Sequence, residues 1–126
     1  MTQKKDSFLT SRLKSIGYAF KGLTYLVKTE SNIKIQLGIA VAVTIAGFYF
    51  DISKTEWLIQ IVCIGLVLSL EGMNTAVEYI SDFIHPDKHD SIGRIKDIAA
   101  GAVFIAAVSA TIAALIIYIP KFFQGL

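Results

Sequence analysis

A run of 22 residues without a charged side chain, from Ile98 to Ile119, constrains this chain more than any other feature. An α-helix needs about 20 mostly apolar residues to cross the hydrocarbon core of a bilayer. Pro120 and Lys121 follow directly, and we expect the helix to end there because proline removes a helical hydrogen bond. The run therefore predicts a transmembrane helix over about 98–119.

Two further segments are apolar enough to span a membrane. The first covers about 33–50, and Leu37 to Phe50 contains only apolar residues, glycine and threonine. The second covers about 57–80, begins at Trp57 and runs uncharged to Leu70 before it becomes amphipathic. Tryptophan is common at membrane interfaces. An all-α integral membrane protein with three transmembrane helices is predicted.

The composition agrees with this fold class. Apolar residues make up 54% of the chain and charged residues 17%, against roughly 45–50% and about 25% in soluble domains. We predict one domain over 1–126, with a tight turn at Asp51 to Glu56 and a polar loop at Ile84 to Lys96. A net charge of only +2, without a basic stripe interleaved with aromatic residues, predicts no nucleic-acid partner.

An amphipathic helix is predicted over about 8–28, ahead of the first span. Apolar residues recur there at spacings of three and four, on one face of a helix: Leu9, Leu13, Ile16, Phe20, Leu23 and Val27. Cations occupy the polar positions. Such a helix can lie flat at a bilayer surface, or it can pack against its own protein.

The basic residues are distributed unevenly. Of twelve Lys and Arg residues, seven precede Leu37, where the uncharged part of the first span begins, and three lie in the loop from Ile84 to Lys96, whereas Lys54 and Lys121 stand apart. Cytoplasmic loops of membrane proteins carry the excess of Lys and Arg. We therefore expect the N-terminus and the second loop to face the cytoplasm.

The second span carries a row of polar side chains. They are spaced i, i+3, i+7 and i+11, within an arc of about 80° of a helix: Glu71, Asn74, Glu78 and Asp82. An unpaired carboxylate inside the hydrocarbon costs about 2–3 kcal/mol or more. One interpretation is a solvated helix end whose acids pair with Lys96 or Arg94.

The other interpretation is a site for magnesium and a nucleotide. Carboxylates supply hard oxygen ligands for Mg²⁺, neighbouring cations contact phosphates, and one carboxylate can accept a proton. The sequence has no P-loop and none of the protein-kinase motifs, which excludes a soluble-kinase fold. His85 and His89 lack a third ligand at zinc-site spacing.

The segment from Glu71 to Asp82 resembles the signature of the prokaryotic diacylglycerol kinase family, E-x-hydrophobic-N-[ST]-[SA]-hydrophobic-E-x-x-V-D. Ser81 is the one departure, in place of valine. Tyr18 to Leu23, Thr29 to Asn32 and Arg94 to Val103 also resemble segments of the family. The resemblance implies a homotrimer with a surface helix, in the bacterial inner (cytoplasmic) membrane, with active sites between protomers.

The resemblance also implies an activity: Mg²⁺-dependent transfer of a phosphoryl group from ATP to the hydroxyl of a membrane lipid alcohol. It gives Glu71 and Asn74 as catalytic residues, Glu30 and Glu78 as metal ligands, and Glu71 and Ser11 as substrate contacts. Some members carry an arginine at the position of Ser11, and Arg12 is adjacent here. The residues implied to contact ATP are Tyr18, Glu30, Glu78, Asp87, Lys88, His89, Lys96 and Asp97.

Two lipid alcohols are substrates in this family, diacylglycerol and undecaprenol. The segments Leu115 to Lys121 and Asp97 to Val103 look more like the undecaprenol kinases. The alternative from another functional class is a non-enzymatic membrane bundle, such as a channel or assembly factor, that uses the acidic row to conduct ions or bind a partner helix.

Overall fold

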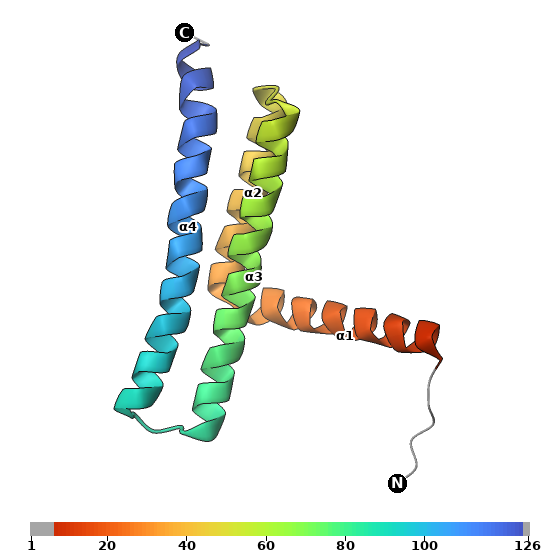
Figure 1. The fold of residues 1–126 in the computed structure, drawn as a ribbon, viewed down its shortest axis with the longest axis vertical. Coiled ribbons are helices and arrows are strands. Elements are labelled where there is room, and N and C mark those ends of the chain that lie inside the picture. Colours follow the sequence, from red (N-terminus) through yellow and green to blue (C-terminus); the bar gives the residue numbers. More distant parts are fainter. Residues whose placement is uncertain (1–6, 125–126) are drawn as a thin grey trace.

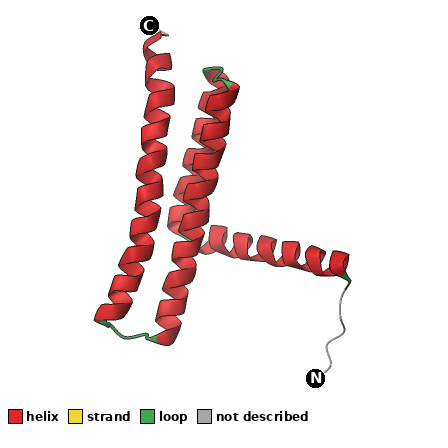
Figure 2. Cartoon of the chain, viewed as in Figure 1, coloured by secondary structure: helices red, strands yellow, loops and turns green. Residues whose placement is uncertain are grey.

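Four helices make up the protein. The structure, a computed structural model, describes residues 7–124. The helices are α1 (Phe8–Thr29), α2 (Ser31–Tyr49), α3 (Lys54–Ile84) and α4 (Asp90–Gln124). Within the described range every element is a helix or a connecting loop (Figure 2). The predicted all-α fold is confirmed. Lys4 and Lys5, which were counted above among the basic residues, lie outside the described residues.

Helices α2, α3 and α4 run side by side, whereas α1 projects sideways from them (Figure 1). All three helices of the bundle are long and apolar enough to cross a membrane. Most of their large apolar side chains are exposed, among them Ile45, Val62 and Phe104. A surface of this kind is stable in lipid, where apolar side chains need no protein partner.

Helix α1 lies on the surface of the molecule. Ser7 caps its N-terminus, since the Ser7 hydroxyl oxygen accepts a hydrogen bond from the Thr10 backbone N–H at 3.2 Å. None of its residues is buried against the described chain, and Leu13 and Phe20 are exposed. The alternative considered for this segment, packing against its own chain, is therefore not what residues 7–124 show.

The turn between α2 and α3 is shorter than predicted. Asp51 takes a left-handed backbone conformation with φ of 51°, and α3 already begins at Lys54. Ser53 and Glu56 form a capping box, in which each side chain bonds to the other residue's backbone N–H. This reciprocal cap starts the helix, so the prediction of a turn through Glu56 was wrong in its second half.

The loop between α3 and α4 is also shorter than predicted. It covers residues 85–89, because α4 begins at Asp90. The ring Nδ1 of His89 accepts a hydrogen bond from the backbone N–H of Ser91 at 3.1 Å, which satisfies a donor that the first helical turn would leave free. Lys96, predicted as the last residue of the loop, is therefore on α4, and Asp97 follows it on the same helix.

Helix α4 continues past the point where it was expected to end. Pro120 lies inside the helix, which runs to Gln124. Proline removes one backbone donor, and membrane helices tolerate this where neighbouring groups compensate. The ammonium group of Lys121 lies 3.0 Å from the Glu56 carboxylate, so the last turn of α4 is held to the first turn of α3.

A polar cluster joins the three long helices near the same end. Gln60, which is buried, donates from Nε2 to the backbone oxygen of Val43 at 3.2 Å. The Tyr118 hydroxyl lies 2.5 Å from Gln60 Oε1 and 3.1 Å from the same Val43 oxygen. The cluster therefore contains one group each from α2, α3 and α4.

Candidate active site

The acidic row on α3 runs from the protein interior to its surface. Glu71 is 5% exposed and Asn74 is 9% exposed. Glu78, two turns further on, is half-buried, and Asp82 is exposed. The row therefore carries one buried carboxylate in the part of α3 that packs on α2, and its other members lie progressively closer to the end of the helix.

Two amides from α2 hold the Glu71 carboxylate. Asn32 Nδ2 donates to Oε1 at 3.3 Å, and Gln36 Nε2 donates to Oε2 at 3.4 Å. Each carboxylate oxygen thus accepts one neutral donor. Both hydrogen bonds are long, so a substrate hydroxyl can approach this carboxylate without displacing a strong ion pair.

Asn74 connects the buried part of the row to Glu78. Its Nδ2 donates to Glu78 Oε1 at 3.3 Å. Its Oδ1 is buried and finds no hydrogen-bond partner anywhere in residues 7–124. A buried acceptor without a partner costs about 1–3 kcal/mol, so Asn74 presents an oxygen that a ligand is able to use.

Glu30 lies between α1 and α2 and faces α3. Its backbone N–H donates to the Leu26 carbonyl at 3.0 Å and closes α1. Its side-chain Oε1 accepts a hydrogen bond from the Tyr79 hydroxyl at 3.4 Å. Tyr79 also lies 3.5 Å from the hydroxyl of Tyr25. Glu30 is therefore placed next to the residue that follows Glu78.

The cations near the row are engaged in part. Lys96 Nζ lies 2.5 Å from Asp82 Oδ1, one turn beyond Glu78, as the solvated-end interpretation predicted for one of the acids. Arg94 instead donates to the Ser91 hydroxyl at 3.1 Å. Asp97 is exposed on the first part of α4.

The remaining predicted residues lie farther from Glu71. Asp87, Lys88 and His89 are exposed in the loop at the far end of α3. Tyr18 and Ser11 are exposed on α1, which leads away from the bundle (Figure 1). Ser11 precedes Glu30 by 19 residues, about 28 Å of helix, so one chain does not bring Ser11 to its own Glu71.

The donor set suits a magnesium ion bound with a nucleotide. Mg²⁺ is usually bound by one or two carboxylates together with substrate phosphates, and it keeps several waters. Glu30, Glu78 and the unpaired Asn74 Oδ1 are hard oxygen ligands of that kind. Across residues 7–124 no group of three or more His, Cys, Asp or Glu side chains forms a closed metal site.

Sequence reasoning gave no role to Asn32, Gln36 or Tyr79, which contact the predicted carboxylates. Asn32 and Gln36 stand four residues apart at the start of the first span, which puts them on one face of α2. Two amides on one face, at the point where the apolar run begins, were the available signal. Their partner on α3 was not apparent from the spacing.

Comparison with known proteins places these features in one family. A sequence profile described as prokaryotic diacylglycerol kinase matches residues 17–118. The chain is 41% identical over 109 residues to undecaprenol kinase of Bacillus subtilis, covering 86% of this chain and 88% of that protein. It is 34% identical over 104 residues to diacylglycerol kinase of Escherichia coli K12, covering 82% and 84%. The Haemophilus influenzae diacylglycerol kinase is 32% identical over 102 residues, covering 81% and 86%.

Fold, site and relatives together define the class of protein, an integral membrane lipid kinase, which is a phosphotransferase with an alcohol acceptor. More specifically, the chain belongs to the prokaryotic diacylglycerol kinase family. The non-enzymatic bundle considered from the sequence is not favoured.

Proposed function

We propose that this protein transfers the γ-phosphoryl group of Mg·ATP to the hydroxyl of a membrane lipid alcohol, with Glu71 as the general base. The buried carboxylate of Glu71, with both oxygens accepting hydrogen bonds from neutral amides, is the observation that carries the proposal. A general base must lie within hydrogen-bond reach of the proton that it accepts. A lipid hydroxyl at the membrane boundary reaches this depth while its tail stays in the hydrocarbon.

The reaction that we propose conserves every atom. The lipid hydroxyl oxygen forms a bond to the γ-phosphorus of ATP as the bond from that phosphorus to the β,γ-bridging oxygen breaks. Glu71 accepts the hydroxyl proton, and ADP leaves with the electron pair of the broken bond. Asn32 and Gln36 keep the carboxylate oriented, and such positioning supplies most of the catalysis in phosphoryl transfer.

Glu30 and Glu78 would hold the magnesium ion, with Asn74 orienting Glu78. When bound, Mg²⁺ offsets negative charge on the phosphates. Lys96 contacts the nucleotide in this proposal, together with Asp97 and the loop residues Asp87, Lys88 and His89. Lys96 pairs with Asp82, one turn beyond Glu78 on α3, and carries a long flexible stem, so an exchange of Asp82 for phosphate as its partner requires only a side-chain movement.

The proposal includes a homotrimer with a cytoplasmic N-terminus in the bacterial inner membrane. The excess of basic residues in α1 and near the second loop supports this orientation. Support for shared sites comes from α1, which carries Tyr18 and Ser11 away from the Glu71 of the same chain (Figure 1). A neighbouring subunit is the natural source of those two contacts.

Undecaprenol is the substrate that we favour over diacylglycerol. The identity is 41% to the Bacillus undecaprenol kinase and 32–34% to the two diacylglycerol kinases compared above. The catalytic carboxylates do not separate the two lipids, since each substrate offers one hydroxyl. Selection between them must come from the part of the protein that holds the tail.

The test is a direct assay of the purified protein in lipid nanodiscs, with Mg²⁺, ATP labelled at the γ-phosphate, and either undecaprenol or dioleoylglycerol. We expect labelled undecaprenyl phosphate to form faster than labelled phosphatidic acid. If no labelled lipid forms with either alcohol while ATP still binds, the lipid kinase proposal is wrong for this chain.

A further inference from the structure

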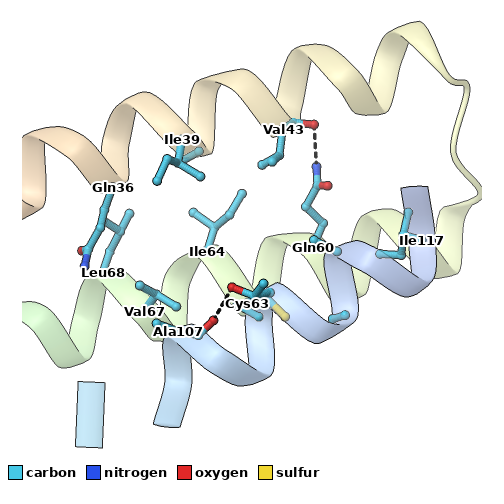
Figure 3. A pocket seen from close by; sticks show the side chains of 15 residues that line it. Gln36, Ile39, Val43, Gln60, Cys63, Ile64, Val67, Leu68, Ala107 and Ile117 are labelled. Carbon is cyan, nitrogen blue, oxygen red and sulfur yellow. Dashed lines mark hydrogen bonds between the residues drawn. The ribbon is translucent and has the colours of Figure 1, made fainter. Parts of the chain in front are cut away.

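A cavity of about 330 Å³ lies between α2, α3 and α4 (Figure 3). This volume is within the range of ligand pockets, about 300–1,000 Å³. Its wall is almost entirely aliphatic, and includes Ile39, Val43, Ile64, Val67, Ala110 and Ile117. No side chain of the described residues fills this volume, which lies among the three apolar helices of the bundle.

The cavity is elongated along the helix axes. On α3 its lining runs from Gln60 to Leu68, about 12 Å at 1.5 Å per residue. At one end stand Gln60 and Ile117, next to the polar cluster with Val43, and at the other end stand Gln36 and Leu68 (Figure 3). The two ends therefore differ, and only the end at Gln36 adjoins Glu71.

Gln36 belongs to both the cavity and the active site. It lines the cavity, and its Nε2 donates to Glu71 Oε2 at 3.4 Å. Because a carboxylate accepts hydrogen bonds and an amide oxygen cannot donate one, this contact fixes the amide with its nitrogen toward Glu71. The oxygen, Oε1, must then face elsewhere.

That oxygen has no partner. Gln36 Oε1 is buried and accepts no hydrogen bond from any described residue. An unpaired buried acceptor costs about 1–3 kcal/mol, and a ligand that brings a hydroxyl donor recovers this cost. A lipid alcohol carries one such donor at the end of a hydrocarbon chain, which matches an acceptor at the head of an apolar cavity.

The cavity offers few donors to a second polar group in the ligand. One N–H of Gln60 is directed to the Val43 backbone oxygen, the Thr111 hydroxyl donates to the Ala107 carbonyl at 2.7 Å, and one N–H of Gln36 is directed to Glu71. Ester carbonyls next to the hydroxyl, as in diacylglycerol, would lie against a wall that is almost entirely aliphatic, where burying a polar group is unfavourable.

We propose that the cavity between α2, α3 and α4 holds the first part of the tail of a polyprenol, and that Gln36 Oε1 accepts a hydrogen bond from its hydroxyl when the lipid binds. The hydroxyl then lies beside Glu71 and turns its one proton to that carboxylate for the transfer step. This inference rests on the proposed lipid kinase function and deepens it. The cavity then selects a hydrocarbon tail without ester groups. Gln36 is an orienting residue, and Glu71 remains the base.

Occupancy is tested first, without catalysis. Cys63 is the single cysteine of the chain and lines the cavity, so its rate of modification by N-ethylmaleimide reports access. The protein is placed in phosphatidylcholine nanodiscs without ATP, with no additive, undecaprenol or dioleoylglycerol at the same mole fraction. We expect undecaprenol to slow the modification and dioleoylglycerol to slow it much less. Equal rates in all three samples would overturn the proposal, as would complete protection without lipid, which would indicate that a second copy of the chain fills the cavity.

A filling substitution tests the same cavity through turnover. Ala110→Leu adds three carbons to the wall, and a single extra methylene in a fitted apolar pocket changes discrimination by about 10-fold or more. We expect Ala110→Leu to raise the KM for undecaprenol by at least that factor. Ala102→Leu is the matched control, because Ala102 is exposed on the same helix and does not line the cavity. An unchanged KM in a folded Ala110→Leu variant would contradict the proposal.

The role of Gln36 is tested by a ratio. If Gln36 only positions Glu71, Gln36→Leu lowers kcat/KM equally for undecaprenol and dioleoylglycerol. If Gln36 Oε1 orients the hydroxyl of undecaprenol, the kcat/KM for undecaprenol divided by the kcat/KM for dioleoylglycerol falls by about fivefold, which corresponds to the loss of one hydrogen bond. A ratio unchanged from wild type rejects the orienting role.

The wild-type protein separates this inference from the proposed function. If it phosphorylates both lipids equally, the proposal that the cavity selects the lipid is wrong but the lipid kinase function stands. If it phosphorylates neither lipid, the lipid kinase function itself is wrong.

Discussion

The ammonium group of Lys96 lies 2.5 Å from Oδ1 of Asp82 and joins the beginning of α4 to the end of α3. The side chains are 37% and 58% exposed, and exposed ion pairs contribute about 0–1 kcal/mol to stability. The pair therefore does little to hold the fold together. The pair instead keeps the ammonium group of Lys96 beside Asp82, which lies one turn beyond Glu78 on α3.

Substitutions of these two residues should have unequal effects. We expect Asp82→Asn to change the free energy of unfolding by no more than about 1 kcal/mol and to leave the KM for ATP close to wild type. Lys96→Ala should raise the KM for ATP because it removes a cation from the phosphates. Steady-state kinetics with varied ATP measures both effects, and equal changes in the two variants would indicate that Lys96 acts only through Asp82.

Glu71→Gln should abolish turnover while it leaves ATP affinity nearly unchanged. The amide keeps the size of the side chain but cannot accept the hydroxyl proton, and loss of general base catalysis typically costs about 10²–10⁴-fold. The variant should fall in kcat and in kcat/KM together. Binding of a fluorescent ATP analogue provides the comparison; kcat like that of wild type would remove Glu71 from the mechanism.

Glu30→Gln and Glu78→Gln should each increase the concentration of Mg²⁺ needed for half-maximal activity. Each change removes one charged oxygen ligand, and Mg²⁺ prefers carboxylates. Glu56→Gln serves as the control, since Glu56 pairs with Lys121 at the opposite end of α3. A magnesium titration at saturating ATP distinguishes the three variants, and identical curves for all of them would move the metal site elsewhere.

Gly47→Ala should destabilise the protein. A Cβ built on Gly47 would lie 2.5 Å from Cη2 of Trp57 and 2.7 Å from its Cζ2, so the ring or the helix must move. Overpacking of this kind costs about 1–3 kcal/mol. Gly38→Ala on the same helix meets no described atom within 4 Å and should stabilise α2 by up to about 1 kcal/mol. Unfolding by increasing dodecyl sulfate in mixed micelles measures both variants, and a neutral Gly47→Ala would mean that the ring relaxes freely.

Tyr118→Phe should lower stability without lowering activity. The hydroxyl bonds to Gln60 and to the Val43 carbonyl, and hydrogen bonds between membrane helices average about 0.6 kcal/mol, with about 1.7 as the upper end. The cluster lies at the end of the bundle away from Glu71. Unfolding in mixed micelles and the lipid kinase assay test this together; a large loss of kcat would couple the two ends of the bundle.

Much of the fold follows from the sequence because spanning helices are long, uncharged and separated by polar residues. The errors lie at the helix ends, where local chemistry decides. The pair Ser53 and Glu56 is a capping box that starts α3 early, and His89 caps α4 ahead of the predicted position. Pro120 predicts the end of the helix, but the helix continues through it.

The site residues that share a helix could be predicted from their spacing, but the contacts between helices could not. The spacing of Glu71, Asn74 and Glu78 puts them on one face, as the structure has them. The contacts of Glu71 with Asn32 and Gln36 join residues 39 and 35 positions apart. They depend on how far α2 is shifted along its axis relative to α3. The spacing of residues within one helix does not predict that shift, so the two amides had no assigned role.

Helix α1 buries none of its residues against the described chain, yet its last residue directly precedes Glu30, the carboxylate that faces Tyr79. The bond from Tyr79 holds Glu30 beside α3, and Asn32, two residues further on, bonds to Glu71 on the same helix. Both carboxylates are therefore positioned by the contact of α2 with α3, so α1 is free to follow the height of the lipid head groups without separating them.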